Sequence, residues 1–276
     1  MAADGASTGR RRSRYVRGPV AEPSLGSNLR GGEIQAMSDE TPYKRCINAA
    51  PVAPPPALAP ARSVLIGRTV RLEPINPACH TAALFRAGHA TEAAQQSWEF
   101  LPWGPFPTEA AMYAQLRDFA AALDRVYYAI CDAATGEALG KATYLDIQPR
   151  AGVIEIGGIW FAPDFARSRG ATEALFVMLA YAMDDLGYRR MQWRCNALNQ
   201  KSRAAARRLG FRFEGIWYNH MIVKGRNRDT AWYSILDTEW PAIRAVMIDW
   251  LDPTNFDANG FQRRSLSAMT AALAAG

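Results

Sequence analysis

A short loop rich in arginine, Arg167 to Gly170, is the stretch of this sequence best suited to bind a phosphate group. It follows an apolar run that ends at Phe161, and it precedes a segment with apolar residues at helical spacing that ends at Leu186. The N-terminus of a helix offers unpaired backbone N–H groups and about half a positive charge, and both stabilise a bound anion. Arg167 and Arg169 add positive side chains. The sequence therefore predicts a strand, an anion-binding loop and a helix.

Two common phosphate-binding motifs do not occur in this loop. A Walker A loop needs Gly-Lys followed by Ser or Thr after a glycine-rich run, and a dinucleotide-binding turn needs the pattern GxGxxG. Neither pattern is present between Phe161 and Gly187. The loop is therefore expected to bind phosphate in another way, unless its arginines are simply solvated.

A single carboxylate, Glu155, interrupts the apolar run Val153 to Phe161. A carboxylate in such a strand is costly unless it is paired or faces a solvated cleft, which makes it a candidate proton acceptor. The alternative is a structural glutamate in a salt bridge or at a sheet edge. Asp146 is a reserve candidate, although a turn is the simpler interpretation. His220 has no carboxylate or cysteine at ligand spacing, so we interpret it as a surface or core histidine.

The elements that must position these residues follow from hydrophobic periodicity and from capping residues. Strands are expected over residues 64–75, 126–131, 139–145, 153–161, 190–195, 213–223 and 229–236. Helices are expected over residues 77–87, 108–123, 171–186, 199–209 and 239–251. Asn199 is a typical N-cap, and Gly210 is a typical C-terminal stop. The pattern predicts one α+β domain with a mixed sheet over residues 63–255.

The first 62 residues differ in composition from the rest of the chain. A basic run at 10–14 and a Pro-rich stretch at 50–61 indicate a disordered basic arm with a stiff tether. Residues 1–36 carry half of the formal net charge of +6, so this charge does not indicate a basic folded surface, and nucleic-acid binding is not expected. Residues 256–276 are interpreted as a C-terminal tail. Met37 is an alternative to Met1 as the translation start.

The cysteines give information about the compartment. They are widely spaced and form no CxxC pair, which predicts a reducing compartment, the cytoplasm, and no metal site; they are Cys46, Cys79, Cys131 and Cys195. The N-terminal arginines are not followed by an apolar core of about 7 to 15 residues, so no secretory signal is expected. No apolar run approaches about 20 residues, so no transmembrane helix and no membrane partner are expected.

Four motifs carry a resemblance to a known family: TEAL at Thr172, LGYRR at Leu186, NQKSRAAARRLGF at Asn199 and GRNRDTAWYS at Gly225. Over residues 64–237 the chain resembles the GNAT acyltransferase superfamily, and within it the ribosomal-protein N-terminal acetyltransferases. The resemblance implies the GNAT fold, with a mixed, mostly antiparallel sheet flanked by helices. It also implies an enzyme that transfers an acetyl group directly from acetyl-CoA to a primary amine.

In this family the loop before the long helix wraps the coenzyme pyrophosphate, usually with the pattern Gln/Arg-x-x-Gly-x-Gly/Ala. Arg167, Gly170 and Thr172 take the first, fourth and sixth places, so a threonine replaces the small last residue. Aligned on the common glycine-rich form of the loop, Arg167 and Arg169 stand where glycines are expected. The resemblance implies coenzyme contacts from Ile159, Trp160, Phe161, Arg167, Ser168, Arg169, Gly170, Ala171, Thr172, Asn199 and Ser202.

The resemblance also implies catalytic roles. The acceptor amine, protonated at neutral pH with an ordinary pKa of about 8 to 10, must lose a proton, and Glu155 is the candidate base. A backbone N–H on the strand Val153–Trp160 would stabilise the oxyanion. Ser202 is the candidate acid for the departing thiolate, with Tyr218 as a second candidate unless it packs on the sheet. The acceptor lip would be formed by Trp98, Trp103 and Phe106, for which a packed aromatic cover is the alternative.

The nature of the acceptor stays open between two classes of amine. The resembled branch favours a protein N-terminus, and a small-molecule amine is the alternative. A non-catalytic acyl-CoA-binding regulatory module is a third interpretation, because loss of glycine in the loop restricts close backbone approach to the coenzyme. The protein is expected to be a monomer or a homodimer.

Overall fold

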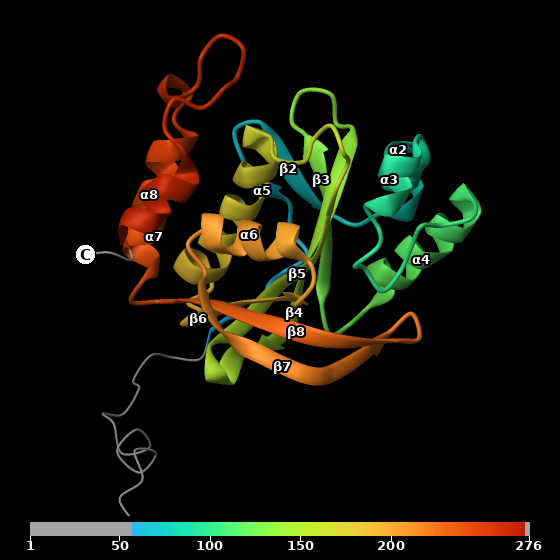
Figure 1. Cartoon of the computed structure of the whole chain (residues 1–276). Helices are drawn as coiled ribbons and strands as arrows, with labels where there is room; N and C mark the ends of the chain where they lie inside the picture. Colours follow the sequence, from blue (N-terminus) through green and yellow to red (C-terminus); the bar gives the residue numbers. More distant parts are fainter. Residues whose placement is uncertain (1–56, 274–276) are drawn as a thin grey trace, which may run out of the picture. The chain divides into compact units, whose positions relative to one another are not determined.

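An eight-stranded sheet runs through residues 57–273, the part of the chain that the computed structural model describes (Figure 1). Its strands are β1 (Leu65–Ile66), β2 (Val70–Pro74), β3 (Val126–Asp132), β4 (Ala138–Gln148), β5 (Val153–Phe161), β6 (Arg190–Asn196), β7 (Arg212–Val223) and β8 (Arg226–Leu236). They lie in the order β1-β2-β3-β4-β5-β6-β8-β7. Among them only β5 and β6 pair in parallel, so the predicted α+β class with a mixed, mostly antiparallel sheet is confirmed.

The α-helices of the described residues are α2 (Pro77–His89), α3 (Glu92–Gln96), α4 (Glu109–Ala121), α5 (Arg169–Ala180), α6 (Gln200–Arg208), α7 (Trp240–Leu251) and α8 (Leu266–Leu273). A π-helical turn, Tyr181–Asp185, continues α5 up to Gly187. The five helices that the periodicity predicts are confirmed to within a few residues. Two short helices, α3 and α8, were not predicted. Within residues 57–273 no helix combines the length and the apolar character needed to cross a bilayer.

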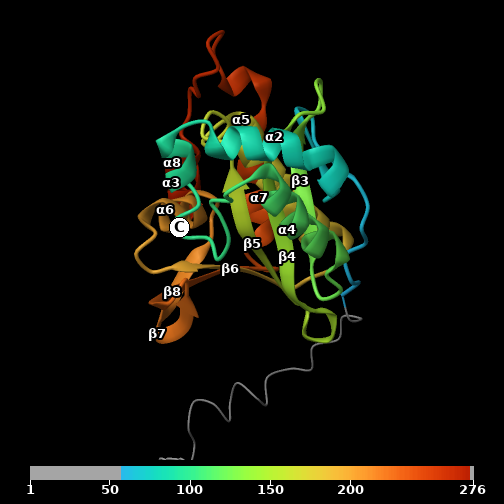
Figure 2. The ribbon, with the colours of Figure 1, turned by 90° about the vertical axis from the view of Figure 1, so that its right-hand side faces the viewer.

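Helices cover both faces of the sheet (Figures 1 and 2). Figure 2 shows α2 and α4 in front of β3 to β5, and we call this side the α4 face. On the opposite side, the α5 face, α5 and α7 pack over the larger core. Alternation along β3 supplies both cores: Tyr128 and Ile130 belong to the α5-face core, whereas Tyr127 and Ala129 belong to the core on the α4 face.

One predicted strand, over residues 64–75, is instead a hairpin of β1 and β2. The turn is held by Glu173 in the first part of α5, whose carboxylate accepts hydrogen bonds from the backbone N–H groups of Arg68 and Thr69. Glu173 is buried, and a buried carboxylate is stable only with such donors. This contact holds the turn that separates β1 from β2, and it joins α5 to the edge of the sheet.

The pairing of β5 and β6 ends early. It covers Val153 to Glu155, after which β5 has no partner on this side. On its other side β5 contains one extra residue, because Thr143 of β4 faces Gly157 whereas Lys141 faces Trp160. Gly158 lies within this irregularity at a φ of +56°, a conformation that favours glycine. Just before this β-bulge, the sheet opens between β5 and β6.

Both predicted boundaries of the domain differ from the structure. At the N-terminal end, Ala57 donates a backbone hydrogen bond to Pro149, and Arg62 donates to the carbonyl of Ala120. At the C-terminal end, the predicted tail contains α8, which packs against α6 and α7 with Leu266 fully buried. The rest of the predicted arm, residues 1–56, and residues 274–276 lie outside the described residues.

Leu266→Ala tests whether α8 is part of the core. Loss of a fully buried leucine leaves a cavity, so the free energy of unfolding should fall by about 2 to 5 kcal/mol. Leu273→Ala in the same helix is the matched control, since Leu273 is 40% exposed and should cost only about 0.5 to 1 kcal/mol. Urea unfolding measures both values. Equal losses would contradict the packing of α8.

Candidate active site

The loop between β5 and α5 confirms the predicted order of strand, loop and helix. Arg167 is exposed and has a φ of +66°, a left-handed conformation that favours the glycine found here in the glycine-rich form of the family loop. Ser168 caps α5, because its Oγ accepts a hydrogen bond from the N–H of Ala171 at 3.0 Å. Within residues 57–273 neither a carbonyl nor a side chain accepts a hydrogen bond from the N–H of Arg169 or of Gly170. Two backbone donors thus remain at the helix terminus.

Arg169 does not provide the mobile charge that the sequence suggested. Its guanidinium donates to the carbonyl of Leu251 at 2.6 Å and lies 4.8 Å from the ring centre of Phe256. This contact joins the loop to the C-terminal segment. Arg169 is therefore held rather than mobile, and Arg167 is the exposed arginine of the pair. The expected contact of Arg169 with a phosphate stays a prediction.

The polar groups of Thr172 form hydrogen bonds within the protein. It is buried, its Oγ1 accepts a hydrogen bond from Arg208 at 3.0 Å, and its N–H donates to the carbonyl of Ser168. Ala171 is buried and its N–H is bound by Ser168. Neither backbone N–H is a free donor, so the expected coenzyme contacts of Ala171 and Thr172 stay predictions without a hydrogen bond from these groups. Gly170 is confined by packing, because a Cβ there would lie 2.9 Å from the ring of Phe165.

The end of β5 carries Ile159, Trp160 and Phe161. Trp160 is buried and stacks on Trp98 with 4.4 Å between the ring centres, so it offers a ligand only its backbone. Trp98 has no exposed surface, and its Nε1 donates to the carbonyl of Gly88 at 3.1 Å. The expectation that Trp98 lines an acceptor site is therefore corrected: it belongs to a packed aromatic cover.

Trp103 and Phe106 are only half-buried. The N–H of Phe106 donates to His89 at 2.8 Å, and Trp103 packs edge-on against Phe119. Lys224, in the turn between β7 and β8, donates to the carbonyl of Gly104 at 2.7 Å in the same loop. The loop between α3 and α4 is thus held from two sides and keeps part of two aromatic rings accessible.

A cleft of about 220 Å³ opens at the β4, β6, β7 and β8 strands. It is lined by Asp146, Arg190, Gln192, Glu214, Gly215, Trp217 and Trp232. Arg194 connects it to Glu155, because Arg194 forms an ion pair with Glu155 and lies 3.7 Å from Asp146. The guanidinium of Arg194 also lies 4.9 Å from the ring centre of Trp232. Glu155 is therefore part of a charged network that extends into the cleft.

The environment of Glu155 sets its protonation. The residue is 3% exposed, and burial raises its pKa to about 7, although the positive charge of Arg194 lowers it. The negative charge of Asp146 raises it further. Glu155 thus forms the salt bridge that the sequence offered as an alternative, and it also has the pKa that suits a proton acceptor at neutral pH.

Asn199 and Ser202 lie at the start of α6. Asn199 caps the helix as predicted, because its Oδ1 accepts the N–H of Ser202 at 3.0 Å. The Oγ of Ser202 accepts a hydrogen bond from Trp193 at 3.0 Å, which leaves its own O–H as a donor. Trp193 belongs to the α5-face core, so Ser202 lies on that side of β6. Tyr218 is 76% exposed on the edge strand β7, so it does not pack on the sheet.

Several residues of this region were missed by the sequence analysis. The buried polar atoms without a hydrogen-bond partner in this region include those of Thr143, Gln192 and Trp232. His220, interpreted from the sequence as a surface or core residue, is half-buried; its ring packs near Trp232 and its Nδ1 lies 3.0 Å from the Oγ1 of Thr230. Burial lowers the pKa of His220. A polar residue within an apolar strand was the available signal, as it was for Glu155.

One cluster of potential metal ligands lies elsewhere, in Glu73, His80 and Cys131. The Nδ1 of His80 accepts the backbone N–H of Asn76 at 3.0 Å, so its Nε2 carries the proton and points to Glu73 at 3.3 Å. A metal-bound histidine normally donates from its second nitrogen instead. Burial also raises the pKa of Cys131 to about 12, which opposes a thiolate ligand. The cluster fits a hydrogen-bonded core contact better than a cation site.

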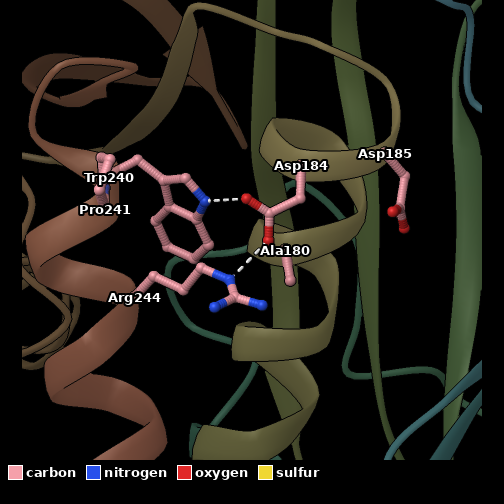
Figure 3. A pocket seen from close by; sticks show the side chains of 6 residues that line it. All are labelled: Ala180, Asp184, Asp185, Trp240, Pro241 and Arg244. Atoms are coloured by element: carbon pink, nitrogen blue, oxygen red, sulfur yellow. Dashed lines mark hydrogen bonds and ion pairs between the residues drawn. The ribbon is translucent and has the colours of Figure 1, made fainter.

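A second hollow, of about 510 Å³, lies between the end of α5 and the start of α7 (Figure 3). Asp184 accepts hydrogen bonds there from Trp240 at 2.6 Å and from Arg244 at 2.8 Å, whereas Asp185 points away. The polar groups of Asp184, Trp240 and Arg244 therefore satisfy one another. We interpret this hollow as a structural junction between two helices, despite its larger volume.

Comparison with known proteins places this geometry in a family. A model of the acetyltransferase (GNAT) domain matches residues 69–212, slightly more than half of the chain. The chain belongs to the GNAT acetyltransferase family. The family that the sequence motifs predicted is thereby confirmed, and with it an acetyltransferase.

Individual relatives agree with this assignment. A GCN5-related N-acetyltransferase from Brucella melitensis is 44% identical, with a TM-score of 0.75 over 78% of this chain and 97% of that one. A probable GNAT-family acetyltransferase from Chromobacterium violaceum is 42% identical, with a TM-score of 0.64 over 70% and 98%. YdaF of Bacillus subtilis (strain 168), named as a candidate ribosomal N-acetyltransferase, is 34% identical over 83 residues, 30% of this chain. The match spans 45%, less than half, of that relative's length.

Arg167 and Arg169 should differ in what they contribute to stability. Arg169→Ala removes a hydrogen bond and a ring contact between the loop and the C-terminal segment, so the free energy of unfolding should fall by about 1 to 3 kcal/mol. Arg167→Gly relieves a left-handed conformation but makes the unfolded chain more flexible, so the net change should stay within about 1 kcal/mol. Urea unfolding of both variants measures the contrast. A larger loss for Arg167→Gly would contradict it.

Proposed function

We propose that the protein transfers an acetyl group from acetyl-CoA directly to a primary amine, with both substrates bound together. The observation that carries this proposal is Glu155, a buried carboxylate whose pKa of about 7 places its proton exchange at neutral pH. It lies at the last paired position of β5 and β6, next to the opening of the sheet. A base at this point can serve an amine that approaches from the α4 face.

The pyrophosphate of acetyl-CoA would bind at the N-terminus of α5. The N–H groups of Arg169 and Gly170 are the available backbone donors, and the exposed side chain of Arg167 adds a positive charge. Because Arg169 is anchored to Leu251, we assign the side-chain contact to Arg167 alone. The pantetheine arm would then follow the unpaired edge of β5, with Asn199 nearby.

In the proposed reaction, Glu155 accepts a proton from the ammonium group of the acceptor. The freed amine nitrogen forms a bond to the acetyl carbonyl carbon, and the bond between that carbon and the coenzyme sulfur breaks. The nitrogen loses its second proton to water, and water restores the proton that Ser202 gives to the sulfur. The O–H of Ser202 is the donor that would protonate the departing thiolate, because its oxygen is already held by Trp193. Glu155 and Ser202 lie on opposite faces near the opening, which supports a direct transfer through it. Tyr218 is too exposed to be the preferred acid.

For the acceptor, we propose a protein N-terminus that enters the 220 Å³ cleft. Gln192 offers an unpaired carbonyl oxygen and Trp232 an unpaired N–H, a combination that matches the donor and acceptor of an extended peptide backbone. Trp103 and Phe106 would cover the approach. A small-molecule amine is the second candidate, because the cleft is small.

We further propose that the enzyme acts in the cytoplasm. The described cysteines, Cys79, Cys131 and Cys195, are all free thiols, which supports a reducing compartment. Cys46 lies outside the described residues. A monomer or a homodimer, with no nucleic-acid or membrane partner and no bound metal, remains the expected state.

Two measurements on the full chain test the proposal. Acetyl-CoA at 100 times its dissociation constant should stabilise the fold by about 2.7 kcal/mol, which a thermal shift detects. Release of free thiol should then follow when peptides with a free N-terminus or small amines are added. Binding without thiol release from any acceptor would instead indicate a non-catalytic acyl-CoA-binding module. No thermal shift at millimolar acetyl-CoA would overturn the proposal.

Arg167→Gly tests the phosphate contact. Removal of one exposed cation should raise the dissociation constant of acetyl-CoA about 3- to 10-fold at low salt, and the difference should shrink as salt increases. Titration calorimetry at two salt concentrations measures both effects. Arg150→Gly is the control, because Arg150 lies in the turn before β5 at the opposite end of that strand. An affinity that does not change in Arg167→Gly would exclude the contact.

The pH profile tests Glu155 as the base. Because the ionised carboxylate is the active form, kcat/KM should rise as the pH increases through about 7 and fall below it. Glu155→Gln should remove this limb and lower the rate about 10²- to 10⁴-fold near pH 7, with a smaller loss at high pH, where the amine loses its proton unaided. Glu214→Gln, which changes another carboxylate that lines the cleft, is the matched control and should keep the limb. A limb that persists in Glu155→Gln would assign the base elsewhere.

A further inference from the structure

Lys141 of β4 is a buried amine to which the proposed reaction gives no role. Its side chain has no exposed surface. The Nζ donates a hydrogen bond to the carbonyl of Gly158 at 2.9 Å, and it lies 3.5 Å from the ring centre of Trp103. The rings of Phe119 and Tyr127 are next, at 5.2 Å and 6.0 Å. The amine is thus enclosed by one carbonyl and three aromatic rings.

This arrangement is costly for the fold. Burial lowers the pKa of Lys141 well below its ordinary value, which shows how poorly the site solvates a charge. A methionine or leucine would fill the same space among aromatic rings without this cost. The contact that only an amine can make here is the hydrogen bond to Gly158. Any advantage of a lysine at this position must therefore come from the backbone orientation that this hydrogen bond holds.

The hydrogen bond fixes one peptide group of the β-bulge. In a trans peptide the carbonyl and the N–H point in opposite directions, so a held Gly158 carbonyl also sets the direction of the Ile159 N–H. Gly158 belongs to the irregular stretch of β5, beyond the residues that pair with β6. A strand that lacks a regular ladder needs another contact to keep this peptide plane in one orientation.

We propose that Lys141 is a positioning residue that orients the Gly158–Ile159 peptide, so that the Ile159 N–H donates to the thioester carbonyl oxygen of acetyl-CoA as that oxygen becomes negative. The inference rests on the proposed function, because it concerns the same reaction. Preorganised donors of this kind are worth about 10²- to 10³-fold in rate when removed, and a donor that is present but loosely held loses part of that.

Lys141 also connects the oxyanion donor to the acceptor side. Trp103, the ring closest to its amine, belongs to the half-buried aromatic loop over the site. A Cβ on Gly158 would lie 3.4 Å from the same ring and 3.1 Å from the Oγ1 of Thr143. The bulge, the amine of Lys141 and the aromatic loop therefore pack as one unit, so the orientation of the Ile159 N–H does not depend on a flexible segment.

Lys141→Met in the full chain is the test, because methionine keeps the length of the side chain and removes the donor. We expect kcat at saturating substrates to fall about 10- to 100-fold while the dissociation constant of acetyl-CoA changes less than about threefold. The melting temperature should stay equal or rise, since an apolar chain replaces a buried amine. A residue with only a structural role would give the opposite pattern, a lower melting temperature with an unchanged kcat. Lys141→Leu replaces this variant if the methionine protein does not fold.

Two further variants control the interpretation. Lys141→Arg keeps a donor in the aromatic cage and should recover part of the lost kcat. Lys224→Met applies the same change to the other lysine that holds backbone carbonyls, those of Trp98 and Gly104 in the aromatic loop. It should raise KM for the acceptor more than it lowers kcat. A kcat of Lys141→Met within threefold of the wild-type value would overturn the proposal.

An NMR measurement separates this inference from the proposed function. Acetyl-CoA and CoA differ by the thioester carbonyl, so the Ile159 amide resonance should differ between the two complexes of the wild-type protein. The difference should vanish in Lys141→Met and persist in Lys224→Met. If the wild-type protein acetylates no amine but shows this pattern, the proposed reaction fails and the positioning role stands. A difference that persists in Lys141→Met, or a wild-type protein that binds no acetyl-CoA, overturns the inference.

Discussion

The early end of the β5–β6 pairing is the constraint on which the site depends. Only Val153 to Glu155 of β5 pair with β6. The following residues of β5 contain the β-bulge at Gly158, on the side that pairs with β4. Where two neighbouring strands no longer share backbone hydrogen bonds, packed side chains must hold the strands in place. The α5-face core and the aromatic residues on the α4 face do so here. A buried carboxylate, that of Glu155, therefore lies where the regular ladder between β5 and β6 ends.

Around this opening, burial and charge act against each other. An exposed glutamate has a pKa near 4, and a buried one without a cation would stay protonated far above neutral pH. Glu155 lies between these limits at about 7, because the guanidinium of Arg194 offsets part of the effect of burial. Arg194 is shared with Asp146 and with the ring of Trp232, so its attraction to Glu155 is limited. Because Arg194 offsets only part of the effect of burial, Glu155 changes its protonation near neutral pH.

Local patterns in the sequence predicted most of the fold, and contacts between distant residues account for what they missed. The strand Val153–Phe161 is found with its bounds, because apolar runs and turn residues are local signals. The β1–β2 turn is held by Glu173, 104 residues away from Thr69, and no local pattern predicts this contact. Arg169 is bound by a carbonyl of α7 that comes 82 residues later. Glu155 was found because it is a charged residue in an apolar strand. Lys141 gives the same signal, but the role that we propose for it depends on its hydrogen bond to the bulge at Gly158, which the sequence does not show.

The arginines in the loop before α5 change how a phosphate would be held, without closing the site. A glycine at the place of Arg167 would let the backbone approach the ligand, and the φ of +66° shows that the chain keeps the path that such a glycine would take. An arginine at this place restricts close approach of the backbone to a phosphate. The exposed guanidinium of Arg167 can instead attract the phosphate over a longer distance. Arg169 is less mobile, because its guanidinium donates to the carbonyl of Leu251 at the end of α7. In the proposed binding mode, the C-terminal segment therefore leaves Arg167 as the exposed arginine of the loop.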